Sequence, residues 1–179
     1  MPHTEIDLYE KPVSSNRLFE GKIINLRRDE VILPNGRTAT REVVEHPGAV
    51  AVVPITKTGQ VVLVRQFRHP VGRIILEVPA GKLDRNEKPE DCALRELAEE
   101  TGFVANKLRK LTSMYTTPGF SNEVIHLYLA EDLVESDQRP DEDEFIKTEQ
   151  YSPEQIRQMI KSGEICDAKS LVALCLAGI

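Results

Sequence analysis

The chain has 179 residues and a formal net charge of −6 at pH 7, with 40 % hydrophobic and 29 % charged residues. These values are typical of one globular domain with a proper core and a small additional unit. The acidic balance argues against nucleic acid as a partner, although a metal ion or a few arginines can reverse the sign locally for a small phosphate compound. We find neither an apolar run long enough to span a membrane nor a basic-plus-apolar leader, and therefore expect a cytoplasmic protein without membrane contact.

The first forty-odd residues are predicted to be rich in β-strand. Two alternating stretches flank Asn35-Gly36, a pair that tolerates positive φ and favours a tight hairpin turn. We expect residues 1–47 to form a small antiparallel β-subdomain and residues 48–179 to form the main domain.

Strands and helices are both expected in the main domain. Apolar or alternating stretches predict strands at residues 49–56, 60–68, 74–81, 123–130 and 144–151. A helix is predicted between Pro89, which suits a first turn, and Gly102, which suits the position just past an end. A second is predicted from a capping box at Ser152 to Gly163, and a third from Asp167 through SLVALCLA. This mixture predicts an α+β fold with helices packed on the faces of a mixed sheet.

The first predicted helix carries three closely spaced carboxylates. At about 100° per residue, Glu96, Glu99 and Glu100 fall at about 0°, 300° and 40°. The expected core face carries Leu94, Leu97 and Ala98. Like charges this close repel one another, so either solvent covers an acidic face or a divalent cation with oxygen ligands relieves the repulsion.

The surrounding residues favour the cation, because the stretch from Gly81 to Phe103 resembles the Nudix box, G-x5-E-x7-R-E-U-x-E-E-x-G-U. Chance agreement at about one in twenty per fixed position is on the order of one in a billion per window. Every specified position is met, by Gly81, Glu87, Arg95, Glu96, Leu97, Glu99, Glu100, Gly102 and Phe103.

The resemblance implies a loop–helix–loop motif, with Gly81 and Gly102 at its turns and a structural ion pair between Glu87 and Arg95. It also implies Mg²⁺, with Mn²⁺ as a substitute, and hydrolysis of a nucleoside diphosphate linked to a group X. The implied metal ligands are the Ala80 carbonyl, Glu96, Glu99 and Glu100.

Outside the box, the chain is similar to bacterial ADP-ribose pyrophosphatases, which implies several substrate contacts. Pro118 lies in YTTPGFSNE, a segment that ends at Glu123 and is expected near the substrate. Arg68 matches a phosphate-contacting arginine, and its forked donors suit that role. Arg65 is the weaker candidate, because it shares a strand side with Leu63 and Phe67.

Arg41 and Glu42 match positions near the nucleoside, in a β-region that in this family commonly reaches a second subunit; we therefore expect a homodimer. Phe19 is the nearest aromatic candidate for an adenine platform, and it is equally compatible with a core position.

The acidic segment RPDEDEFIKTE completes the expected site. In related enzymes a loop here supplies a glutamate that binds metal or deprotonates the water, and the spacing to Phe145 favours Glu144 over Glu142. With Glu100, these two are the expected catalytic residues.

We therefore expect a Nudix α/β/α sandwich that hydrolyses ADP-ribose to AMP and ribose 5-phosphate with Mg²⁺. The alternatives are hydrolysis of another nucleoside diphosphate compound, such as a sugar nucleotide or a dinucleotide, and a non-catalytic nucleotide-binding module.

Overall fold

The computed structural model describes residues 8–139 and 144–179. The chain divides into two compact units. The smaller comprises the chain up to Pro47 together with Tyr115–Glu123, and the larger comprises Gly48–Met114 and Val124–Ile179. Each unit is described by itself.

The smaller unit is built on a three-stranded antiparallel sheet in the order β1-β2-β3. Its strands are β1 (Lys11–Glu20), β2 (Asn25–Ile32) and β3 (Thr38–Glu45). The hairpin predicted at Asn35-Gly36 is confirmed, since Gly36 has a φ of 82° and the Arg37 N–H donates to the Asn35 side chain at 3.1 Å.

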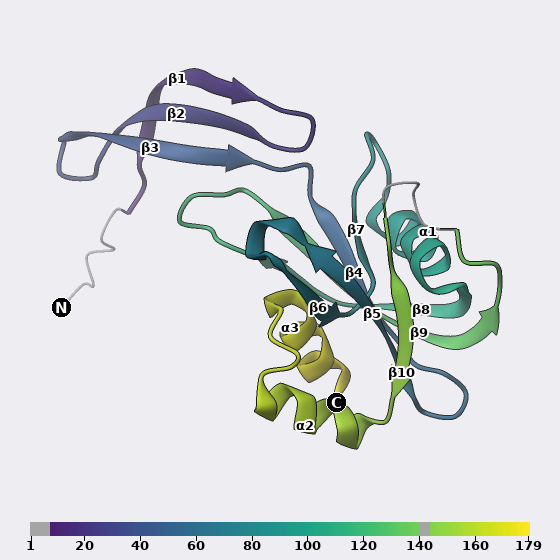
Figure 1. Cartoon of the computed structure of the whole chain (residues 1–179). Helices are drawn as coiled ribbons and strands as arrows, with labels where there is room; N and C mark the ends of the chain where they lie inside the picture. The colour runs from purple at the N-terminus through teal and green to yellow at the C-terminus, as the bar shows by residue number, and fades with distance from the viewer. Residues whose placement is uncertain (1–7, 140–143) are drawn as a thin grey trace, which may run out of the picture. The chain divides into compact units, whose positions relative to one another are not determined.

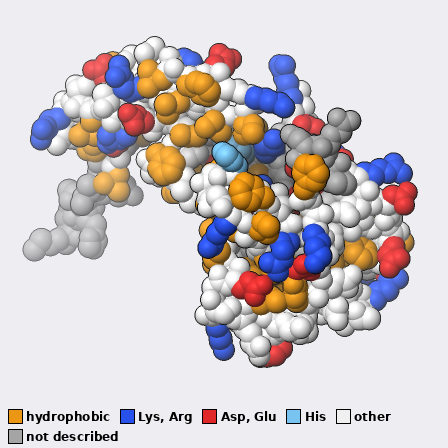
Figure 2. Space-filling view, viewed as in Figure 1, with side chains coloured by type: hydrophobic (Ala, Val, Ile, Leu, Met, Phe, Trp, Pro, Cys, Tyr) orange, Lys and Arg blue, Asp and Glu red, His pale blue; other side chains and the backbone are white. Residues whose placement is uncertain are grey.

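This sheet buries almost nothing within the described chain. Val31 is the one buried residue that the described part of this unit contains, and every residue of β1 is exposed. Exposed apolar side chains gather on this unit in Figure 2. A three-stranded sheet without a covered face has little hydrophobic stabilisation of its own.

The segment Tyr115–Glu123 is tied to the end of β3. The Val44 N–H donates to the Phe120 carbonyl at 2.8 Å, and the His46 N–H donates to the Asn122 side chain at 2.9 Å. Pro118 occupies a turn closed by a 3.0 Å bond from the Phe120 N–H to the Thr117 carbonyl.

The larger unit has two sheets and three α-helices (Figure 1). One sheet has the order β10-β5-β6 and the other β7-β4-β9-β8, in which β4 and β9 are parallel. The strands are β4 (Ala49–Pro54), β5 (Val61–Arg68), β6 (Arg73–Glu77), β7 (Ala80–Lys82), β8 (Phe103–Tyr115), β9 (Val124–Glu135) and β10 (Lys147–Tyr151). The helices are η1 (His69–Val71), α1 (Pro89–Thr101), α2 (Pro153–Ser162) and α3 (Ala168–Ala177).

Helices cover both faces of the central strands. Along β4, Val50 and Val52 pack in the cluster with α1, whereas Ala51 and Val53 pack in the cluster with α2 and α3. Alternate side chains of one strand therefore enter opposite cores, as a strand buried on both faces requires. The expected α/β/α sandwich, with an antiparallel sheet before it, is confirmed.

Most predicted elements are confirmed, including all three helices. α2 begins at the predicted capping box, in which Ser152 and Gln155 exchange side-chain bonds, and ends at Gly163. Asp167 caps α3 by accepting from the Ser170 N–H. Among the described residues, no helix has the length and apolar character that a membrane span requires.

One predicted strand is wrong. Residues 74–81 were expected as a single strand, but the chain leaves one sheet after Glu77 and enters the other at Ala80. Pro79, which lies between β6 and β7, has no N–H for a ladder, while its carbonyl accepts from the Val52 N–H at 2.9 Å. The long strand β8 was not predicted, because it has little period-two pattern.

Candidate active site

The box helix buries the side that carries Glu100. The residues of α1 that are buried are Cys92, Ala93, Leu97, Glu100 and Thr101. The predicted core face is therefore wrong in part: Leu97 is buried, but Leu94 is 36 % exposed and Ala98 is only half-buried. Hydrophobic residues alone gave the wrong direction, because a buried carboxylate occupies the face toward the domain.

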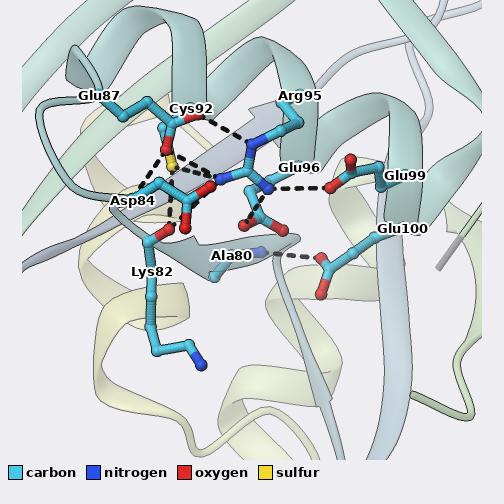
Figure 3. A network of polar contacts seen from close by, with 9 residues as sticks. All are labelled: Ala80, Lys82, Asp84, Glu87, Cys92, Arg95, Glu96, Glu99 and Glu100. Atoms are coloured by element: carbon cyan, nitrogen blue, oxygen red, sulfur yellow. Dashed lines mark hydrogen bonds and ion pairs between the residues drawn. The ribbon is translucent and has the colours of Figure 1, made fainter. Parts of the chain in front are cut away.

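An ion pair joins the loop to the helix, as predicted (Figure 3). The Arg95 guanidinium donates to Glu87 through Nε at 2.9 Å and Nη2 at 3.0 Å. Its Nη1 donates to Glu96 at 2.8 Å and to Glu99 at 2.9 Å. The hydrogen bonds from Arg95 lower the pKa of Glu87 to about 2.

Gly81 makes room for Glu96. A Cβ at position 81 would lie 1.8 Å from Glu96 Cδ, so no side chain fits there while the carboxylate keeps its place. Gly102 ends the helix with a φ of 70°, and its N–H donates to the Ala98 carbonyl. Both box glycines thus meet a steric or conformational demand.

Glu100 is almost fully buried, with 1 % of its surface exposed. Its Oε2 accepts from the Ala80 N–H at 2.9 Å, which joins the helix to β7. Burial raises the pKa of the Glu100 carboxyl to about 8; the Ala80 N–H opposes this, and the charges of Glu96 and Glu144 add to it.

These side chains fit a hard divalent cation. Glu96 and Glu100 converge on the Ala80–Gly81 backbone (Figure 3), which offers carboxylate oxygens where the chain is partly closed to water. Such oxygen donors suit Mg²⁺ and Mn²⁺. Within the described residues no group of three or more His, Cys, Asp or Glu side chains is already arranged as a metal cluster, since Arg95 draws Glu96 and Glu99 toward itself.

Arg68, the predicted phosphate contact, is held by an unpredicted partner. Its Nε and Nη2 donate to Glu77 at 2.7 and 3.1 Å. Burial opposes the charge of Arg68, but Glu77 and then Glu100 and Asp167 outweigh it and raise the pKa of the guanidinium. A glutamate inside the apolar run IILEVPAG was the signal that sequence analysis overlooked, because a buried carboxylate requires a cation.

The acidic loop is described in part. Glu144 lies close enough to raise the pKa of both Glu96 and Glu100, in each case as a smaller contribution than burial. Glu142 lies outside the described residues.

The other expected substrate contacts lie in the smaller unit. Arg41 is paired with Glu10 at 2.5 Å, and Glu42 is exposed beside it on β3. Glu123 accepts from Thr116 at 2.7 Å and is 3.3 Å from the His46 ring.

The remaining two residues of that set are Phe19 and Pro118. Phe19 is exposed on β1, so it is not a core residue. Pro118 is exposed in its turn. The substrate roles of all these residues stay predictions.

Comparison with known families agrees with this geometry. Residues 45–173 match the NUDIX domain, and residues 10–44 match the nucleoside diphosphate sugar hydrolase N-terminal domain. The chain belongs to the Nudix family. It is a pyrophosphohydrolase that acts on nucleoside diphosphate compounds.

Two relatives match nearly end to end. The chain is 47 % identical over 169 residues to an ADP-ribose pyrophosphatase of Bacillus subtilis (strain 168), covering 93 % of this chain and 91 % of that one. It is 43 % identical to a methanol dehydrogenase activator of Bacillus methanolicus, covering 92 % and 90 %. A crystal structure of an ADP compounds hydrolase superposes with a TM-score of 0.83 at 22 % identity, over 94 % of this chain and 91 % of that one, and so shares the fold.

Proposed function

We propose that the protein hydrolyses ADP-ribose to AMP and ribose 5-phosphate with Mg²⁺. The observation that carries the proposal is the 47 % identity to an ADP-ribose pyrophosphatase across more than nine tenths of both chains. The complete box supports it, because Glu96, Glu99 and Glu100 are all present and two of them face the Ala80–Gly81 backbone.

The proposed metal ligands are the Ala80 carbonyl and the three box glutamates. A bound divalent cation would neutralise charge on the pyrophosphate oxygens and lower the pKa of a water. For Glu96 and Glu99 to serve, their carboxylates must turn from Arg95, which keeps its bidentate bond to Glu87.

The chain's own groups then divide the remaining work. Arg68 orients the diphosphate through Nη1 of its guanidinium, while Nε and Nη2 stay bound to Glu77. Glu144, with Glu142 as the second candidate, accepts the proton of the attacking water. Arg41, Glu42, Phe19, Pro118 and Glu123 are the proposed contacts to the rest of the substrate.

We test the proposal by measuring kcat/KM for ADP-ribose, GDP-sugars, dinucleoside diphosphates and damaged nucleotides, each with Mg²⁺ and with EDTA. The expected result is Mg²⁺-dependent release of AMP, with ADP-ribose ranked first. A higher kcat/KM for another compound would contradict the proposed substrate, and equal rates in EDTA would contradict the metal.

A non-catalytic role has one specific observation in its favour, the similarity to a methanol dehydrogenase activator. Binding of nucleoside diphosphates without turnover of any of them would favour that role. The complete set of box carboxylates supports catalysis instead.

We further propose a cytoplasmic homodimer. The exposed apolar side chains of the smaller unit, among them Val13, Leu18 and Phe19, support a second copy of the chain as their cover. Sedimentation velocity tests this, and a monomer at micromolar concentration would contradict it.

A further inference from the structure

A fully buried carboxylate in the larger unit accepts hydrogen bonds from two cationic side chains. Glu77, the last residue of β6, has none of its surface exposed. Its Oε1 and Oε2 accept from Arg68, and its Oε2 also accepts from the Lys169 ammonium. A buried carboxylate with two cationic partners is a more constrained group than one with a single partner.

Strand register explains why Arg68 reaches Glu77. In the β5–β6 hairpin, Val64 lies opposite Glu77 and Arg68 lies opposite Arg73. Positions 64 and 68 project from the same side of β5, so the Arg68 side chain and Glu77 share one face of the sheet. Nε and Nη2 of Arg68 are occupied by Glu77, which leaves Nη1 for a ligand within the described contacts.

Lys169 comes from a different part of the fold, the first turn of α3. Its side chain is 13 % exposed, and it also donates to Asp167 at 2.9 Å. Asp167 is itself fixed by the Ser170 N–H at 3.0 Å and the Ser170 hydroxyl at 2.6 Å. Lys169 is therefore held between two carboxylates, Glu77 and Asp167.

The same turn holds the backbone that leads to the box. The Ser170 hydroxyl accepts from the Val78 N–H at 2.9 Å, one residue after Glu77 and two before Ala80. Ala80 in turn donates to Glu100. The start of α3 thus fixes both the side chain of Glu77 and the chain entering the carboxylate site.

The charges of this group cancel. Arg68 and Lys169 contribute two positive charges, and Glu77 and Asp167 contribute two negative ones. Without Lys169 the group would carry a net negative charge near Glu100, and the Glu77 carboxylate would be held by Arg68 alone. Both changes weaken a site for a diphosphate.

We propose that Lys169 is a positioning residue for the diphosphate of the substrate, acting through Glu77 on the guanidinium of Arg68. This inference rests on the proposed function, in which Arg68 contacts the diphosphate. Lys169 itself touches neither substrate nor metal in this assignment.

The test is a double-mutant cycle of Glu77→Gln and Lys169→Met. Partners remain for the charges that are left: the amide oxygen introduced by Glu77→Gln can still accept from Arg68, and Asp167 remains beside Ser170. The readouts are kcat, KM and the Kd of a methylene-bridged, non-hydrolysable analogue of whichever compound wild type hydrolyses fastest, which we expect to be ADP-ribose.

Lys169→Met is expected to raise Kd and KM about tenfold, with kcat at saturation changed less than about threefold. In the Glu77→Gln background it should raise Kd much less than about tenfold, because the carboxylate that couples Lys169 to Arg68 is gone and only the positive charge of Lys169 is lost. Lys169→Arg should restore most of the affinity. The matched control is Lys147→Met, which removes an exposed lysine bound to Glu149 and should leave Kd unchanged.

If the double variant raised Kd by the product of the two single-variant factors, the inference would be overturned, because Lys169 would then act independently of Glu77. An unchanged Kd in Lys169→Met, with the melting temperature lowered, would overturn it as well and leave a structural role. Failure of the proposed function would show separately, as a fastest substrate other than ADP-ribose in wild type.

Discussion

Arg95 Nε lies 2.9 Å from Glu87 Oε1, and this contact joins the loop before α1 to the middle of the helix. The same guanidinium binds Glu96 and Glu99, so one cation relieves the crowding of three carboxylates. Its bidentate contact to Glu87 persists if the other two carboxylates turn toward a metal ion.

Glu87→Gln is expected to lower the free energy of unfolding by about 1–3 kcal/mol, because it removes a charge-assisted pair that is mostly shielded from water. Urea unfolding measures the change. The control is Glu154→Gln, which breaks an exposed pair with Arg157 and should change the free energy of unfolding much less, because solvent screens an exposed ion pair. Equal costs for both variants would contradict a structural role for the box pair.

Glu100→Gln is expected to lower kcat at least about a thousandfold at saturating Mg²⁺, because it removes a charged oxygen donor from the proposed metal site. The fold should persist, since an amide oxygen can still accept from the Ala80 N–H. Chromatographic measurement of AMP release gives the turnover, and the far-ultraviolet circular dichroism spectrum reports on the fold. Near-normal turnover would remove the helix from the mechanism.

Gly81→Ala is expected to weaken Mn²⁺ binding about tenfold or more, because the new Cβ would occupy the place of the Glu96 carboxylate. Electron paramagnetic resonance titration of Mn²⁺ measures the affinity. Gly119→Ala is the matched control, since a Cβ there meets nothing within 4 Å. Unchanged Mn²⁺ affinity in Gly81→Ala would mean that Glu96 is not a ligand.

Glu149 gives a prediction for acid stability. Hydrogen bonds from Lys147, and then from Tyr151 and Arg65, lower the pKa of Glu149 to about 2 from its ordinary value of 4.5. A carboxylate whose pKa is lowered by folding stabilises the fold at pH values above its pKa in the unfolded state. This contribution disappears as the pH falls through its pKa in the folded state.

Glu149→Gln should therefore be less stable than wild type at pH 7, by about 1–3 kcal/mol, and the difference should shrink between about pH 5 and about pH 2. Urea unfolding at a series of pH values measures it. A difference that stays constant down to about pH 2 would show that packing, and not the charge of Glu149, stabilises this contact.

The sequence by itself determined the local structure and the chemistry of the box. Ser152 and Gln155 form the predicted capping box, and Gly102 takes the left-handed conformation expected past a helix end. The ion pair of Glu87 with Arg95 also follows from the motif. These features can be predicted from the sequence because they depend on residues within a few turns of one another.

Only the tertiary structure decided which way the box helix faces. Hydrophobic residues placed the core toward Leu94 and Ala98, yet the domain buries Glu100. Helix periodicity assumes that carboxylates face water, and this assumption fails where a buried site is built from charged groups.

The ion pair of Glu77 with Lys169 is the second feature that only the tertiary structure determines. The two residues stand 92 positions apart, on β6 and α3. Sequence alone shows that a glutamate in an apolar strand needs a cation, but a strand has no fixed relation to a distant helix until the sheet and its covering layer have packed.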